Sequence, residues 1–399
     1  MASFHYGGQA LIEGVLMRGR NALAIALRHP DGSIVWATER LDLGLRARRA
    51  LKMPFLRGLV VLYDTLVTGT RWLVRSATVQ AVGLEEQGAA TPGSGGATAA
   101  LGGLLRTLTL FAGPALCAAT GPGAGVGPTG DAESGGDAGP TSYSDPDGAA
   151  STSTSAAEQG LGKGYQVAVG GMLLLSLVLG IGIFFLLPLL LAQATAPVVG
   201  RGLGLQLSEG VIRVAIFVGY LLLMSRMGDV ARTFQYHGAE HMSIHAMEGG
   251  NPLTVEAARR YPTAHPRCGT EFLVVVVIVS ILAFALVGSQ SPLILLGSRV
   301  LLIPIIAAVS YEILQLGARH RDRAIVRWLW SPGIWVQAIT TKQPTDDMIE
   351  VAIVSLERAI IADGGELPEG STAFACRRLN PESTPVGVEL GSSFGTPEG

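Results

Sequence analysis

The segment RTFQYHGAEHMSIHAMEGG concentrates imidazole and carboxylate side chains more densely than any other part of the chain. If it forms one helix ending at Gly249 and Gly250, successive side chains are rotated by about 100°. One arc of about 140° then holds most of the polar groups: His237, Glu240, His241, His245 and Glu248. The opposite side carries small residues, so we expect that side to pack closely against a neighbouring helix.

His237 and His241 are one helical turn apart, a spacing that lets two imidazoles bind the same tetrahedral ion. With Glu240 they form the pattern H-x-x-E-H, known from metalloproteases in which the histidines bind zinc and the glutamate acts as a general base. A pattern of five residues also occurs by chance, so it does not establish a metal site by itself. The spacing of the two histidines supports the hypothesis of a zinc site with Glu240 as its catalytic residue.

Further along the same loop, the sequence HPRCG adds His265 and Cys268 in a proline-containing turn. A tetrahedral set of His237 and His241 completed by His265, Cys268 or Glu248 is chemically reasonable for a divalent metal, and zinc suits these donors best. His245, on the same arc of the helix, is a further candidate ligand. A structural site would use four protein ligands, whereas a catalytic site leaves one position open. The competing interpretation is that the histidines only line a polar loop or contact lipid headgroups.

The composition indicates a membrane protein. Charged residues make up 15% of the chain, against about 25% in soluble proteins, and the mean hydropathy is +0.41. A net charge of -2 gives no basic field for nucleic acid, so we expect no nucleic-acid partner. The three widely separated cysteines suggest no disulfide framework. The N-terminal segment lacks the pattern of a cleavable signal peptide.

Apolar runs predict a mainly α, polytopic fold with about four transmembrane helices. The expected spans are residues 167–192, 211–225, 272–288 and 300–316, the last two forming an antiparallel hairpin. Arg213 lies near one end of its span, where we expect the side chain to reach the interface. Together with the segments between and after them, these spans define a membrane domain over residues 165–363.

Basic residues in short loops stay on the cytoplasmic side of a membrane, which gives the orientation. They are concentrated in loop 226–271, which carries the histidines, and in residues 317–345, whereas Arg201 and Arg299 are the basic residues of the opposite loops. We therefore expect a multi-pass protein of the bacterial inner membrane with both termini in the cytoplasm.

Outside the spans, the sequence predicts a small cytoplasmic α+β part. In the N-terminal region, residues 1–82, the turn sequence HPDG predicts a β-hairpin, and residues 54–77 form a helix that either lies in the membrane interface or packs on a cytoplasmic domain. Residues 83–164 and 364–399 are biased toward small and polar residues and are expected to be disordered, although 101–118 could form a further hydrophobic element. Residues 345–361 should form an amphipathic cytoplasmic helix.

Two more features bear on function. Glu312 lies at the end of the fourth expected span, where an ionisable side chain is either functional or has reached the cytoplasmic interface. The N-terminal sequence YGGQALIEGVLMRG contains closely spaced glycines, which indicate that this backbone approaches another element closely.

Several segments taken together resemble the YqhQ-like family of bacterial membrane proteins. They are GGQALIEGVLMRG at 7–19, YHGAEHMSIHAMEGG at 236–250, HPRCGTEF at 265–272, SYE at 310–312 and TTKQP at 340–344. The resemblance covers nearly all of the chain outside the two segments expected to be disordered, residues 83–164 and 364–399. It implies a domain of unknown function whose members are labelled, by prediction, as metal-dependent enzymes, and it implies no substrate.

The sequence thus predicts a metal-dependent membrane protein. The activity it suggests is zinc-dependent hydrolysis of a substrate at the cytoplasmic membrane face. Its partners are expected to be membrane lipids and other membrane proteins. The alternative is a non-enzymatic membrane scaffold, or a small ion transporter, with a structural metal site.

Overall fold

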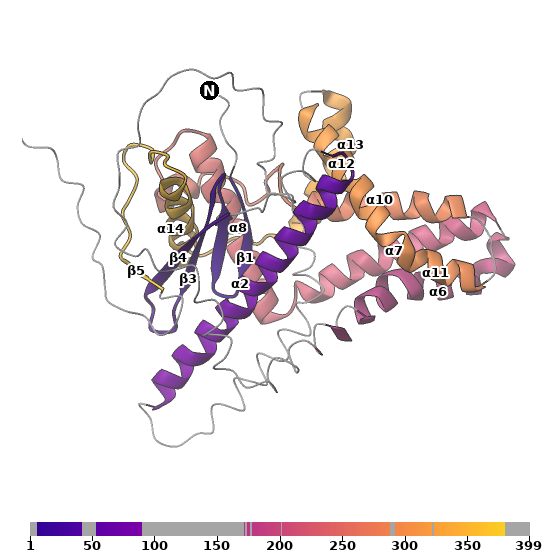
Figure 1. The fold of residues 1–399 in the computed structure, drawn as a ribbon, viewed down its shortest axis with the longest axis horizontal. Helices are drawn as coiled ribbons and strands as arrows, with labels where there is room; N and C mark the ends of the chain where they lie inside the picture. Colours follow the sequence, from indigo (N-terminus) through magenta and orange to yellow (C-terminus); the bar gives the residue numbers. More distant parts are fainter. Residues whose placement is uncertain are drawn as a thin grey trace, which may run out of the picture.

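The structure is a computed structural model that describes residues 6–41, 53–89, 171, 174–175, 178–200, 202–287, 292–320 and 323–379. A small sheet and its covering helices form one part of the molecule, and a set of long apolar helices projects from it on the other side (Figure 1). The expected hydrophobic element at 101–118 lies outside the described residues, as does most of the expected insert.

The sheet contains four antiparallel strands in sequence order and a fifth, parallel strand at its edge. The strands are β1 (Gly7–Leu11), β2 (Gly14–Arg18), β3 (Ala22–Arg28), β4 (Ile34–Arg40) and β5 (Cys376–Arg378). The predicted hairpin is the β3–β4 pair, and Gly32 adopts the positive φ of 87° that its turn requires. The glycine-rich N-terminal sequence supplies the additional hairpin β1–β2.

Helices cover both faces of the sheet, because successive side chains of a strand point to opposite sides. On one face, Ala24 and Ala26 pack against α8 (Gly228–Glu248) and α14 (Asp346–Ala362). On the other face, Leu23 and Ile25 pack against Trp72 of α2 (Leu56–Ala89). The site-bearing helix α8 is therefore part of the core between β1 and α14.

Two expected boundaries differ from the structure, and one expected helix is more deeply buried than its sequence indicated. Helix α2 continues to Ala89, into the segment expected to begin a disordered insert at residue 83. Residues 364–379 of the expected disordered tail are described, because β5 pairs with β4 and extends the sheet. The helix expected at residues 345–361 is present as α14, and it is buried on nearly all sides, since the sheet covers one face and α8 another.

Among the residues that the structure describes, three helices are long and apolar enough to cross a membrane: Val178–Val199, Gly204–Met224 and Thr270–Val287. The first consists of helical residues 178–181, the π-helical turn η1 (Gly182–Leu186) and α6 (Leu187–Val199), and the others correspond to α7 (Leu203–Met224) and α10 (Thr270–Val287). The fourth expected span, residues 300–316, is divided at Leu302: its first two residues end α11 (Pro292–Leu301), and the rest lie in α12 (Ile303–Arg319). Pro304 at the start of α12 lacks the N–H of a continuous helix, which explains the division. Helices α9 (Val255–Ala258) and α13 (Ala324–Thr340) complete the described part.

Three charged side chains are buried together among the apolar helices. Glu209 accepts hydrogen bonds from Arg213 at 2.6 Å and from Arg299 at 2.7 Å. Both guanidinium groups also lie over the ring of Phe284. Contrary to expectation, Arg213 and Arg299 are both buried among the helices, because a carboxylate on α7 pairs with both of them.

Glu312 is held at the junction of α2 and α12. Arg57 Nε donates to its Oε1 at 2.8 Å, and the backbone N–H of Phe55 donates to the same atom at 2.9 Å. Helix α2 approaches α12 closely here, because Gly58 faces the side chain of Tyr311. Glu312 is therefore an anchor between two helices, and α2 packs on the sheet and on α12.

Candidate metal centre

Helix α8 places His237 and His241 on adjacent turns, with their ring centroids 4.4 Å apart. Both side chains are buried, with 9% and 2% of their surface exposed. Their small neighbours permit close packing: Gly238 faces the backbone carbonyl of Lys342, and Ala239 is fully buried. The face that was expected to be smooth is thus pressed against the segment after α13, which fixes the orientation of the imidazoles.

Cys268 completes a three-residue group with these histidines. It ends the loop before α10 and is buried, and its Sγ lies 3.1 Å from His237 Nε2. The potential ligand atoms of His237, His241 and Cys268 all lie within 4.8 Å of one another. A tetrahedral zinc ion with ordinary bond lengths would separate a nitrogen and a sulfur ligand by about 3.5 Å. The donor set therefore has the chemistry and approximate spacing of a zinc site.

Backbone carbonyl groups orient both imidazoles. His237 Nδ1 lies 3.0 Å from the carbonyl oxygen of Thr340, and His241 Nδ1 lies 2.6 Å from that of Thr263. A carbonyl oxygen only accepts, so Nδ1 carries the proton in each ring and Nε2 retains its lone pair. This is the usual arrangement around metal-binding histidines, where an outer hydrogen bond fixes the ring and its tautomer.

The protonation states of the group favour metal binding. Burial lowers the pKa of His241, which therefore stays neutral and able to donate its lone pair. Burial raises the pKa of the Cys268 thiol, but the nearby His241 and the hydrogen bonds from Thr270 outweigh that effect, and the net pKa lies below its usual value. Neutral imidazoles and an acidified thiol are the forms that bind zinc.

Glu240 lies beside this group, enclosed by α8 and β1. Its side chain is 3% exposed, and its Oε2 has no hydrogen-bond partner within the part of the chain that the structure describes. Burial raises its pKa to about 8, although His237 and a hydrogen bond from the backbone N–H of Gly8 lower it. A Cβ atom at Gly8 would lie 3.0 Å from Glu240 Oε1, so the expected close approach of the glycine-rich N-terminus occurs at the candidate site.

The other candidate ligands form a second group. His245, Glu248 and His265 also bring their ligand atoms within 4.8 Å of one another. Their hydrogen bonds differ, however: His265 Nδ1 accepts from the backbone N–H of Arg267 at 3.2 Å, and the Arg267 side chain binds Glu248 at 2.6 Å. His245 Nε2 lies 3.0 Å from the carbonyl oxygen of Ala264. Because His265 Nδ1 accepts a hydrogen bond instead of donating one to a backbone carbonyl, the tautomer that would leave Nε2 free to bind a metal is not favoured.

Some supporting residues could not be identified from the sequence. Gln337 of α13 is fully buried, and its side-chain amide binds both the backbone N–H and the carbonyl of His265, at 2.8 and 2.9 Å. It fixes the loop that carries Cys268. A lone glutamine in an apolar helix gives no functional signal. The TTKQP segment, in contrast, was noted as a motif, and Thr340 is its first residue.

Comparisons with known proteins give a family. The model of the family described as "Protein of unknown function (DUF1385)" matches residues 146–362, which is more than half of the chain. The chain is 28% identical over 355 residues to "Uncharacterized protein YqhQ" of Bacillus subtilis (strain 168), covering 89% of this chain and 92% of that protein. No solved structure matches. The protein therefore belongs to the DUF1385 family, together with YqhQ-like proteins, as its sequence motifs had indicated.

Proposed function

We propose that this protein is a zinc-dependent hydrolase of the bacterial inner membrane, with His237, His241 and Cys268 as metal ligands. The observation that carries the proposal is the convergence of these three donors within 4.8 Å while both histidines present Nε2. Three protein ligands leave the fourth tetrahedral position free, as in catalytic zinc sites. Zinc bound there would act as a Lewis acid and lower the pKa of a water molecule.

Glu240 is the residue for proton transfer. Its carboxylate borders the ligand group, and its Oε2 is buried without a partner among the described residues. A carboxyl group whose pKa is raised to about 8 can hold and release a proton within a unit of neutral pH, which suits general acid–base work. A divalent cation beside it would favour the charged form and so lower its pKa. Glu240 would then take a proton from the attacking water and return it to the leaving group.

The location of the site limits its substrates. The loop that carries Cys268 leads directly into α10, a helix able to cross a membrane, and α7 ends just before α8. With basic loops on the inner side, the histidine-bearing region and both termini face the cytoplasm. The bond that is cleaved would therefore lie at the cytoplasmic membrane surface, in a peptide or in a lipid-linked group.

Metal content is the first test. We expect about one zinc per chain in purified wild type by elemental analysis, and a large loss in His237→Ala/His241→Ala. His320→Ala is the matched control, because His320 is bonded to its own helix at Leu316 and lies outside the group. Equally low zinc in wild type and in the double variant would refute the metal site.

A second substitution separates an enzyme from a scaffold. The ligand side chains are at most 9% exposed, and this burial favours a structural metal site as the competing function. In an enzyme, Glu240→Gln should retain zinc and expression yet fail to complement a strain that lacks the gene. Normal complementation by Glu240→Gln would favour the scaffold. The ion-transporter alternative is weaker, because Glu312 is paired with Arg57.

A further inference from the structure

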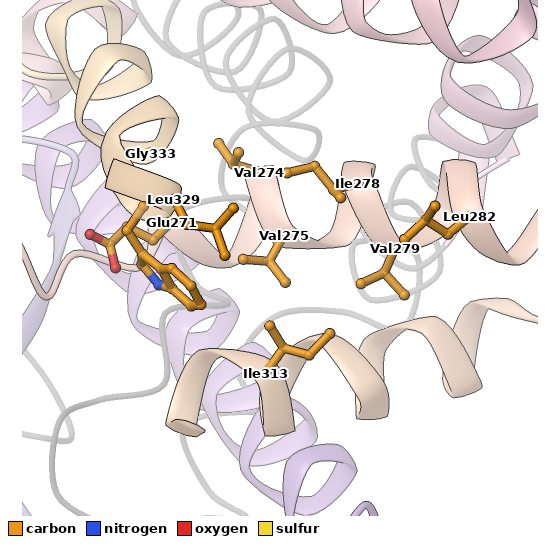
Figure 2. A pocket seen from close by; sticks show the side chains of 10 residues that line it. Glu271, Val274, Val275, Ile278, Val279, Leu282, Ile313, Leu329 and Gly333 are labelled. Carbon is orange, nitrogen blue, oxygen red and sulfur yellow. The ribbon is translucent and has the colours of Figure 1, made fainter. Parts of the chain in front are cut away.

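An apolar groove lies along α10 and is closed by side chains of α12 and α13. It has a volume of about 120 Å³. Figure 2 shows Glu271 at one end and Leu282 at the other, with Ile313 of the neighbouring helix facing Val275 and Val279 between them. Ile278 and Leu282 are 44% and 61% exposed, so the groove opens toward the surroundings at that end, whereas Glu271 is 2% exposed. The single acidic residue thus marks the enclosed end.

The groove has the length of one membrane leaflet. Glu271 and Leu282 are eleven residues apart on a continuous helix, which corresponds to about 16 Å at 1.5 Å per residue. The hydrocarbon core of a bilayer is about 30 Å thick, so one leaflet measures about 15 Å. Because α10 is long enough to cross the membrane, its first half passes through the leaflet nearest the metal centre.

Two helices connect the groove to the metal centre. Cys268 lies one turn before Glu271, and its carbonyl accepts the backbone N–H of that residue at 3.2 Å. Helix α13 lines the groove with Trp330 and Gly333, and its next turn carries Gln337, which fixes the site loop. The enclosed end of the groove therefore borders the candidate site.

The groove also contains an unused donor near this end. The indole Nε1 of Trp330 is buried and has no hydrogen-bond acceptor within the described ranges of the chain. The ring is held in place by close contact with α12 at Gly317. A buried indole N–H normally has a partner. An ester carbonyl at the head of a lipid chain would provide one.

We propose that this groove binds one hydrocarbon chain of a lipid in the cytoplasmic leaflet and brings its polar head to the metal centre. The substrate class would then be a membrane lipid or a lipid-linked group. Apart from Glu271, the groove is lined by apolar side chains and by Gly333, which suits a hydrocarbon chain. The claim about substrate rests on the proposed function, whereas chain binding can be tested without it.

Native mass spectrometry of protein purified in mild detergent tests chain binding. We expect wild type to retain a phospholipid and Ile278→Trp, which fills the groove, to retain about tenfold less, equivalent to about 1.4 kcal/mol of binding free energy. Leu286→Trp is the control: it also introduces a tryptophan on the same helix, at a side chain that is 89% exposed and does not line the groove. Equal retention in all three proteins, or none in wild type, would overturn the proposal.

A second measurement applies even if Ile278→Trp fails to fold. Phospholipids brominated on the acyl chain should quench wild-type tryptophan fluorescence more than that of Trp330→Phe, and an equal response would contradict chain binding. Zinc measured in the same preparations keeps the two proposals separate. Zinc without lipid retention refutes the groove alone, and lipid retention without zinc refutes the metal centre alone.

Discussion

His237 Nε2 and Cys268 Sγ lie 3.1 Å apart, although 31 residues separate them in the chain. The histidine is fixed from behind by the carbonyl oxygen of Thr340, and the cysteine is held at the start of α10. The contact therefore joins the sheet-bound helix α8 to the helices able to cross the membrane. A metal at this position would connect the two parts of the molecule, so its removal should destabilise both.

Zinc affinity should increase with pH. Binding requires the thiolate of Cys268 and neutral imidazoles, so protons are released when zinc binds. Although the pKa of Cys268 is lowered, protons still compete at acidic pH. Competition with a chromophoric chelator should show weaker binding at about pH 6 than at about pH 8. Cys268→Ala should bind weakly at both pH values, and a wild-type affinity independent of pH would argue against a thiolate ligand.

Gly8→Ala should disturb Glu240 without removing a ligand. The added methyl group would lie 3.0 Å from Glu240 Cδ and Oε1 and would also press on the Leu16 carbonyl. We expect a loss of about 1–3 kcal/mol in stability, as for other overpacked sites, and reduced complementation with zinc retained. Gly219→Ala is the control, because nothing lies within 4 Å of its added Cβ. Thermal unfolding in detergent would distinguish the variants, and matching curves would disprove the close contact.

Glu209→Gln should strongly destabilise the apolar helices. It would leave Arg213 and Arg299, both buried, without their counter-charge. Removing one partner of a buried ion pair costs about 3–5 kcal/mol. Glu39→Gln, which disrupts an exposed pair with Arg71, should cost less than about 1 kcal/mol. A similar small change in melting temperature for both variants would show that the buried group adds little.

Glu357→Gln should stabilise the protein at alkaline pH. Burial raises the pKa of Glu357 from 4.5 to about 7, although Arg358 lowers it. The folded chain therefore binds this proton more tightly than the unfolded chain, and the resulting stability is present below pH 4.5 and lost as pH rises through about 7. The variant should gain about 1–3 kcal/mol over wild type at pH 8 and little at pH 5. Glu366→Gln, at an exposed side chain, should follow the wild-type curve, and no pH-dependent difference would contradict the burial of Glu357.

Helical periodicity was sufficient to place His237, Glu240 and His241 together, because residues one turn apart share a helix face. It could not choose between His265 and Cys268, since the direction of a loop side chain depends on contacts such as that of Gln337. The β3–β4 hairpin followed from its turn sequence. The burial of α14 and the pairing of β5 did not, because both depend on contacts between the two ends of the chain.

The Glu209 group shows another limit of sequence patterns. Arg299 follows an apolar segment and, as a charged residue, was assigned to a loop. In the structure it pairs with the carboxylate of Glu209, 90 residues earlier in the chain. A hydropathy pattern considers each charged residue separately and therefore places its side chain at the membrane interface. Only the structure, in which Arg299 of α11 reaches Glu209 of α7, shows that opposite charges are paired instead.

X-ray absorption at the zinc edge tests the ligand set most directly. In wild-type protein loaded with zinc, we predict two nitrogen ligands from imidazoles and one sulfur ligand at about 2.3 Å. Cys268→Ala should lose the sulfur contribution, whereas Cys376→Ala should keep it, because Cys376 lies in the sheet at β5. A wild-type spectrum with no sulfur ligand, or one unchanged in Cys268→Ala, would contradict the proposed centre.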